Sequence, residues 1–232
     1  MSRQIVLDTE TTGLDPKLGH RIIEVAGVEL FNRRLTGRYF HRYLNPERDI
    51  DAGAEAVHGL SRDFLQDKPR FADIADELLD FLGDAELVIH NAAFDVGFLN
   101  HELSMLERPP ITDMHAVLDT LKLARELNPG QKNNLDALCR RYEVDNTSRT
   151  VHGALLDAEL LAAVYLAMTR GQDVLIEVHA LSNARQEAEL PADMVLPVIY
   201  ADELEQRMHT TVLQSIQKAS KGACLWLKSD VT

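Results

Sequence analysis

The stretch Ile5-Val6-Leu7-Asp8-Thr9-Glu10 lies near the start of the chain and decides the fold. Its first three residues are apolar, as expected for a strand that is buried on both faces of a sheet. Side chains alternate between the two faces of a strand, so Asp8 and Glu10 point to one face and Thr9 to the other. Two carboxylates placed in this way can share a hard cation such as Mg²⁺ or Mn²⁺. The alternative is an ordinary solvated strand end.

The apolar pattern of the following residues predicts an α/β domain. We expect two further strands at 22–31 and 38–44, joined by a hairpin loop at 32–37, and a short buried strand at 87–89. Apolar residues at helical spacing predict a helix at 71–82, and we expect further helices at 94–106, 119–127 and 134–142 and an almost wholly apolar one at 153–169. Three strands followed by alternating helices and strands indicate a mixed β-sheet flanked by helices.

Two later segments also place an acid beside an apolar run. His90-Asn91-Ala92-Ala93-Phe94-Asp95 follows a predicted strand, and His152-Gly153-Ala154-Leu155-Leu156-Asp157 begins a predicted helix that is otherwise almost wholly apolar. Buried carboxylates must be paired or bound to a metal, so the three segments together indicate a divalent-metal site. For Asp95 the alternative is a helix-terminus charge, and for His152 it is a helix cap or a satisfied core histidine.

Composition sets limits on the class of protein. The 232 residues suffice for one substantial core, and no apolar run approaches the roughly 20 residues of a membrane span. Cys139 and Cys224 lie far apart without metal-ligand spacing, so we expect a reducing, cytoplasmic location. The net charge of −13 is unusual for a chain that grips nucleic acid alone, because Lys and Arg supply that grip. A bound metal or a partner protein would have to help.

The character of the sequence changes after the predicted core. We expect a core domain at 1–170, a flexible linker at 171–195 and a C-terminal docking segment at 196–232. The last part carries a narrow apolar stripe and, beyond it, the only tryptophan: Leu204, Met208, Val212, Ile216 and Trp226. An amphipathic helix with an aromatic anchor suits docking into a groove of a partner. The alternative is that the tail packs on its own domain.

The order of the motifs resembles a known group of enzymes. Asp-x-Glu, then His-Asn-Ala-x-Phe-Asp, then His-x-x-x-x-Asp is similar to the histidine branch of the DEDD superfamily of 3′→5′ exonucleases. Residues 56–60, 135–139 and 150–157 further resemble the family of proofreading (epsilon) subunits of bacterial DNA polymerase III. The likeness covers about residues 3–170 and resumes in the tail. It implies a ribonuclease-H-like fold and two-metal phosphodiester hydrolysis that releases 5′-monophosphates.

The resemblance also implies roles for single residues. Asp8, Glu10 and Asp157 would hold the Mg²⁺ or Mn²⁺ ion that activates water. Asp8 would bridge to a second such ion, supported by Asp95, and His152 would take the proton of the attacking water. The residues implied around the terminal nucleotide are His58, Thr11, His90, Phe94 and Gly53. Gly53 stands where we expect some relatives to carry an acidic residue, so it offers no side-chain contact to the 3′ hydroxyl.

The partners follow from the same likeness. Gln172-Asp173-Val174-Leu175-Ile176 resembles the peptides that dock on the sliding clamp (beta), with Gln172, Leu175 and Ile176 as its contacts; an ordinary linker is the alternative. The stripe in the tail would hold the polymerase (alpha) subunit, and a small theta-type subunit is a further candidate partner.

We therefore expect an enzyme that excises mismatched 3′ nucleotides within a replicase. An exoribonuclease that trims RNA ends is the first alternative, because the same metal chemistry cleaves either backbone. A mainly structural stabiliser of the polymerase subunit is the second.

Overall fold

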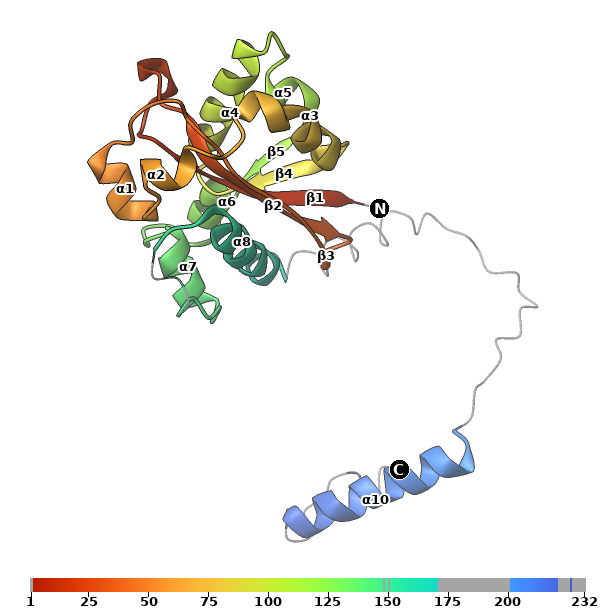
Figure 1. The fold of residues 1–232 in the computed structure, drawn as a ribbon. Helices are drawn as coiled ribbons and strands as arrows, with labels where there is room; N and C mark the ends of the chain where they lie inside the picture. The colour runs from red at the N-terminus through yellow and green to blue at the C-terminus, as the bar shows by residue number, and fades with distance from the viewer. Residues whose placement is uncertain (1, 148, 150, 171–200, 221–225, 227–232) are drawn as a thin grey trace, which may run out of the picture. The chain divides into compact units, whose positions relative to one another are not determined.

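The computed structural model describes residues 2–147, 149, 151–170, 201–220 and 226 (Figure 1). It divides into two units, 1–180 and 181–232, which are described separately. The predicted linker at 171–195 and the clamp contacts Gln172, Leu175 and Ile176 lie outside the described residues. Within the described part, no helix has the length and apolar character to cross a membrane.

A mixed sheet of five strands forms the centre of the first unit. Its order is β3-β2-β1-β4-β5; β1 pairs antiparallel with β2 and parallel with β4, β2 and β3 are antiparallel, and β4 and β5 are parallel. The bounds are β1 Arg3–Thr11, β2 Ile22–Phe31, β3 Arg34–Tyr43, β4 Glu86–Ile89 and β5 Val117–Asp119.

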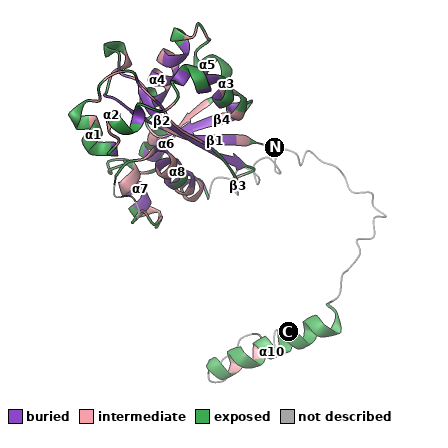
Figure 2. Cartoon of the chain, viewed as in Figure 1, coloured by how far each residue is buried: buried purple, intermediate pink, exposed green. Residues whose placement is uncertain are grey.

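Alternation along β1 gives each face of the sheet its own core. Ile5 and Leu7 pack in a cluster with residues of α3 (Phe71–Leu82) and α4 (Ala93–Met105). Val6 packs in a second cluster with residues of three other helices, α6 (Thr120–Leu127), α7 (Leu135–Arg141) and α8 (Ala154–Met168). Figure 2 shows β1 buried between these two layers of helices. Each fully buried aliphatic side chain contributes about 1.5–3 kcal/mol, so covering both faces fixes the position of β1.

The hairpin between β2 and β3 differs from the sequence prediction. A loop at 32–37 was expected, but β3 already begins at Arg34 and only Asn32 and Arg33 form the turn. Both have positive φ, 47° and 62°. A two-residue turn of this kind matches the twist of the flanking strands, and asparagine tolerates it well. The polar Thr36-Gly37 pair looks like a loop but lies in the exposed strand β3.

Short elements were missed from the sequence because they lack a full period. These are β5, a 3₁₀ turn and three helices: Pro16–Leu18, α1 (Ala52–His58), α2 (Arg62–Leu65) and α5 (Ile111–Met114). The predicted longer helices are confirmed to within about a residue at each end. The carboxylate of Asp119 caps α6 by accepting hydrogen bonds from the amides of Leu121 and Lys122.

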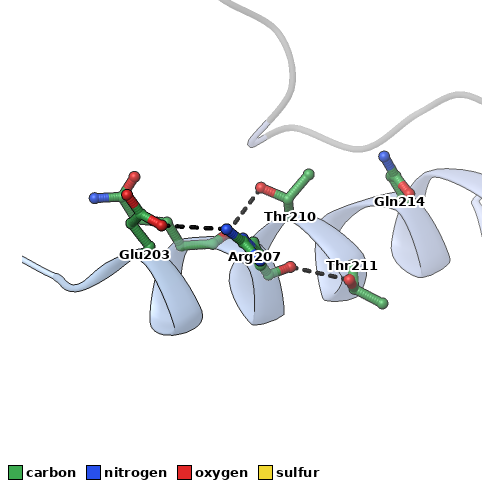
Figure 3. A pocket seen from close by; sticks show the side chains of 6 residues that line it. Glu203, Arg207, Thr210, Thr211 and Gln214 are labelled. Atoms are coloured by element: carbon green, nitrogen blue, oxygen red, sulfur yellow. Dashed lines mark hydrogen bonds and ion pairs between the residues drawn. The ribbon is translucent and has the colours of Figure 1, made fainter.

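The described part of the second unit is mainly one helix, α10 (Glu203–Ala219). Asp202 and Glu205 form a capping box at its start. The predicted stripe lies exposed along one side: Leu204, Met208, Val212 and Ile216. Figure 3 shows the polar side, where Glu203 pairs with Arg207 at 3.1 Å. There, the hydroxyls of Thr210 and Thr211 donate to backbone carbonyls one turn earlier. Trp226 is also exposed.

A buried ion pair holds the start of β2 against α4. Glu102 is 1% exposed and accepts hydrogen bonds from Nε and Nη2 of Arg21, both at 2.7 Å. Its Oε1 also accepts from the amide of Ile22 at 3.2 Å. Nearby, the amide of Arg21 donates to Thr12 Oγ1. The pair therefore helps to fix the chain that leaves β1.

Glu102→Ala should lower the free energy of unfolding by roughly 2–4 kcal/mol, because it leaves Arg21 partly buried without its carboxylate. The change is measured by urea unfolding, provided that the dependence of the unfolding free energy on urea concentration (the m value) is the same in both proteins. Glu77→Ala, which removes the exposed partner of Arg42, is the matched control and should cost under about 1 kcal/mol. Equal losses in the two variants would contradict this role of Glu102.

Candidate active site

The carboxyl end of β1 turns two acids toward α8. Asp8 and Glu10 share the face of Val6, which packs toward that helix. Asp157 lies in the first turn of α8 and is 4% exposed. Ligand atoms of Glu10, Asp157 and His152 lie within 4.8 Å of one another. The structure thus brings together Glu10 and Asp157, which the sequence assigned to a metal site, and His152, which it assigned to proton transfer.

The fourth acid reaches the same place from the other face of the sheet. Thr9 points toward α4, where Asp95 lies in the first turn and is 3% exposed. The amide and the hydroxyl of Thr9 donate to Asp95 Oδ1 at 3.1 and 2.7 Å. Asn91, at the turn between β4 and α4, has a φ of 61° that asparagine accepts. Strand alternation therefore explains how both helices supply acids to one end of β1.

Burial, with help from neighbouring charges, raises the pKa of Asp8, Glu10 and Asp95. Burial and then the charges of Asp95, Glu10 and Asp157 raise the pKa of Asp8 well above its ordinary value. Burial and then the charge of Asp157 raise the pKa of Glu10 from 4.5 to about 8. Burial also raises the pKa of Asp95 to about 7, although the hydrogen bonds from Thr9 oppose the shift. A divalent cation would relieve this repulsion.

His152 stands at the rim of the acid cluster. Its Nδ1 lies 3.5 Å from Asp157 Oδ2, and its side chain is 45% exposed. Partial burial and the charge of Arg149 lower its pKa below the usual range, so the ring is neutral near pH 7. A neutral imidazole in this position can accept a proton. Its amide donates to the carbonyl of Val57 at 3.1 Å, which ties this loop to α1.

A largely apolar pocket of about 420 Å³ opens beside Glu10. Its lining contains four of the predicted substrate residues: Thr11, Gly53, His58 and Phe94. His58 Nδ1 accepts a hydrogen bond from the amide of Leu60, so Nε2 carries the proton. That buried Nε2 has no hydrogen-bond partner among the described residues. The pocket thus offers an unpaired donor next to an aromatic ring, which suits a nucleotide.

The hydroxyl of Thr11 is engaged elsewhere, since it donates to the carbonyl of Gly13 at 2.7 Å. His90 lies apart from the apolar pocket. It lines a second hollow of about 290 Å³ together with Asp8, His152 and Asp157, and its Nδ1 lies 3.0 Å from Thr120 Oγ1. The acid cluster therefore has a hollow on each side, and His90 belongs to the polar one.

Two charged residues of the site were missed from the sequence. Arg149 places its guanidinium on Asp157. The sequence feature that could have indicated Arg149 is the presence of a basic residue within one helical turn of His152 along the chain. Glu24, on β2, is 2% exposed, pairs with His41 at 2.7 Å and helps to raise the pKa of Glu10. Its signal was an acid inside the apolar run of residues 22–26.

The donor set fits hard divalent cations. Its members are carboxylate oxygens, with one imidazole at the edge. Oxygen donors of this kind favour Mg²⁺ or Mn²⁺ over softer metals. Burial and the neighbouring carboxylates raise the pKa of Asp8 and Glu10, so a bound cation would favour their charged forms. Glu10 and Asp157 have ligand atoms close enough together to hold one metal ion, and Asp8 lies near enough to Asp95, Glu10 and Asp157 for their charges to raise its pKa.

Comparison with known proteins agrees with this geometry. The family model described as exonuclease matches residues 5–165. DNA polymerase III subunit epsilon of Salmonella typhimurium (strain LT2) is 49% identical over 238 residues, covering 97% of this chain and 98% of the relative. A solved structure of exonuclease X in complex with 5′ overhanging duplex DNA has a TM-score of 0.58 at 27% identity, covering 72% of this chain and 92% of that one.

The fold itself is shared with a more distant structure. The nuclease domain of a 3′-exonuclease, described as a DEDDh family member bound to rAMP, has a TM-score of 0.63 at 19% identity. The match covers 73% of this chain and 92% of that one. This confirms the ribonuclease-H-like mixed sheet predicted from the sequence. The chain belongs to the exonuclease family and, within it, to the family of DNA polymerase III epsilon subunits.

Proposed function

We propose that this chain is the 3′→5′ proofreading exonuclease of a bacterial replicative DNA polymerase. The observation that carries the proposal is the cluster of buried acids at the end of β1, with a neutral histidine at its rim. The 49% identity to a DNA polymerase III epsilon subunit over nearly the whole chain supports the replicative role. The reaction is hydrolysis of the terminal phosphodiester bond, which releases a 5′-monophosphate.

Each acid has a defined part in this proposal. Asp8, Glu10 and Asp157 would hold one divalent cation, and Asp8 with Asp95 would hold the second. When bound, Mg²⁺ or Mn²⁺ ions here would supply the positive charge that stabilises the attacking and the leaving oxygens of an in-line displacement. His152 accepts the proton of the attacking water on a ring nitrogen, as its lowered pKa allows. Glu24 acts behind the site by adding to the negative charge around Glu10.

The apolar pocket is the proposed site of the terminal nucleotide. Phe94 offers a ring for stacking, and the Nε2 proton of His58 is a free donor for an oxygen of that nucleotide. An unpaired 3′ terminus separates from its template at low cost, so a mismatched end enters a single-strand site more readily than a paired one. Selection for mismatches follows from this difference.

The partners belong to the proposal as well. The exposed apolar side of α10 suits docking on the polymerase (alpha) subunit, because Leu204, Met208, Val212 and Ile216 gain burial there. Trp226 would add an aromatic anchor. We also propose that residues 172–176 bind the sliding clamp, and that the core unit is the part available to a theta-type subunit. The enzyme would act in the cytoplasm, where the chromosome is copied.

The function is tested by excision rates with Mn²⁺ on mismatched DNA ends, paired DNA ends and RNA ends. Mismatched DNA should be degraded fastest, because its terminus frays most easily. His152→Ala should lower the rate on every end by roughly 10²–10⁴-fold, as expected for loss of a general base. Mn²⁺ affinity, measured by calorimetry, should stay close to that of the unmodified chain.

Asp157→Asn is the counterpart, because it should remove both hydrolysis and Mn²⁺ binding. A faster rate on RNA than on mismatched DNA would replace this proposal with an exoribonuclease. Loss of metal binding in the His152 variant would make that histidine a ligand and not a base.

Metal-free protein should lose stability as pH rises from about 4.5 to about 8. The pKa of Glu10 is raised from 4.5 to about 8 by folding, so the folded chain binds the extra proton within this window. The stability contributed by this proton on Glu10 is complete below about pH 4.5 and is lost as the pH rises past about 8. The melting temperature in EDTA measures it, and Mg²⁺ should restore more stability at pH 8 than at pH 5.5.

Glu10→Gln is the control for this window, since an amide of similar shape does not titrate. The variant should show a flatter profile in EDTA than the unmodified chain. An equally steep profile would show that Glu10 does not carry the effect.

The docking role of α10 is tested by charged substitutions on its two sides. Met208→Asp with Val212→Asp should abolish co-purification with the polymerase subunit, because burying two new carboxylates is costly. Thr210→Asp with Gln214→Asp, on the opposite side, is the matched control and should retain the complex (Figure 3). Hydrolysis of single-stranded DNA by each preparation shows that the core unit is folded. Retention of the complex by the first variant would refute the docking surface.

A further inference from the structure

The guanidinium of Arg149 binds Asp157, a carboxylate that the proposed metal ion would need. Its Nε lies 2.5 Å from Asp157 Oδ1 and its Nη2 lies 2.7 Å from Oδ2, so both carboxylate oxygens are engaged. The two side chains are 8% and 5% exposed. Among the described residues, Arg149 is the arginine that pairs with Asp157. A buried bidentate pair of this kind is strong and well oriented.

The same guanidinium covers the histidine. Nη2 of Arg149 lies 2.9 Å from Nδ1 and 3.2 Å from Nε2 of His152. Nearly equal distances to both ring nitrogens place the guanidinium against the ring, and its positive charge lowers the pKa of His152 and so opposes uptake of a proton there. One side chain thus masks both an acid and the proposed base.

A metal ion and Arg149 cannot both hold Asp157 in this way. A divalent cation needs at least one of the carboxylate oxygens, and at that distance it repels the guanidinium. Arg149 would have to give up its bonds through Nε and Nη2. Its third contact, from Nη1 to Asp136 Oδ1 at 3.0 Å, does not involve the metal site. Asp136 is 45% exposed and remains available as an anchor.

The place to which Arg149 can move is the polar hollow. Arg149 and Asp136 line it together with His90, His152 and Asp157. If the chain hydrolyses DNA as proposed above, the anion that enters this hollow is the phosphate of the terminal link. Guanidinium groups bind phosphate oxygens bidentately, with the same geometry that they use on a carboxylate.

We propose that Arg149 exchanges partners during metal and substrate binding. In the metal-free protein it neutralises Asp157 and covers His152. When metal takes Asp157, Arg149 stays anchored on Asp136, uncovers His152 and binds the substrate phosphate. This inference rests on the proposed function, and it adds a substrate-binding residue that also weakens metal binding and covers the base before DNA arrives.

The exchange gives effects of opposite sign in Arg149→Met. Mn²⁺ binding without DNA should become about tenfold tighter, because the competing cation is gone. Binding of a single-stranded phosphorothioate oligonucleotide at saturating Mn²⁺ should become about tenfold weaker, because a phosphate contact is lost. Calorimetry measures the first and fluorescence anisotropy the second, both on the full chain. Arg140→Met, at an exposed position on α7, removes the same charge and should change neither value.

A merely structural role for Arg149 predicts that both affinities weaken or that metal affinity is unchanged, and either result overturns the proposal. Tighter metal binding with unchanged DNA affinity also overturns it, since no phosphate contact was lost. If the methionine variant does not fold, Arg149→Lys takes its place. Lysine keeps the positive charge but cannot make the bidentate pair with Asp157, so this variant should still bind Mn²⁺ more tightly than the unmodified chain. Asp157→Asn distinguishes failure of the proposed function from failure of the inference about Arg149. If this variant keeps its Mn²⁺ affinity, the proposed metal site itself is wrong.

Discussion

The carboxylates at the end of β1 are buried together with too little positive charge. Helices cover both faces of the sheet, so each acid that alternation directs to a face enters a low-dielectric layer. Glu10 reaches Asp157 on one side, and Thr9 holds Asp95 on the other. Burial and then the neighbouring charges raise the pKa of Asp8 and Glu10, and a divalent cation would favour their charged forms. The same arrangement that completes the fold therefore prepares the proposed chemistry.

The sequence predicted features that depend on local periodicity and fixed spacing. α3 is strongly amphipathic, β1 and α8 contain apolar runs, and the alternation of Asp8, Thr9 and Glu10 follows directly from strand geometry. Prediction from the sequence failed where contacts between distant residues determine the local structure. The three residues of β5 carry no full period, and the turn at Asn32-Arg33 depends on strand twist. Arg149 could not be placed on Asp157 because the loop between α7 and α8 has no pattern that fixes its path.

The acidic balance of the chain is consistent with a site that is supplied with DNA by a partner. With a net charge of −13, the chain has little long-range attraction for a phosphate backbone. The exposed apolar side of α10 offers a means of attachment that does not depend on charge. Attachment to a polymerase would raise the effective concentration of the 3′ end near the acids, without any basic surface on the nuclease itself. Weak intrinsic affinity would then also limit hydrolysis of paired ends, which do not separate readily from the template.

One loop links the two hollows beside the acids. It carries Arg149 and His152, and the amide of His152 donates to the carbonyl of Val57 on α1. The next residue of α1 is His58, whose unpaired Nε2 belongs to the apolar pocket. A nucleotide that engages His58 would therefore act on the helix to which this loop is bonded. In the proposed scheme, the backbone hydrogen bond from His152 to Val57 would link filling of the apolar pocket to release of Arg149 from Asp157, because it joins the loop that carries Arg149 to the helix that carries His58.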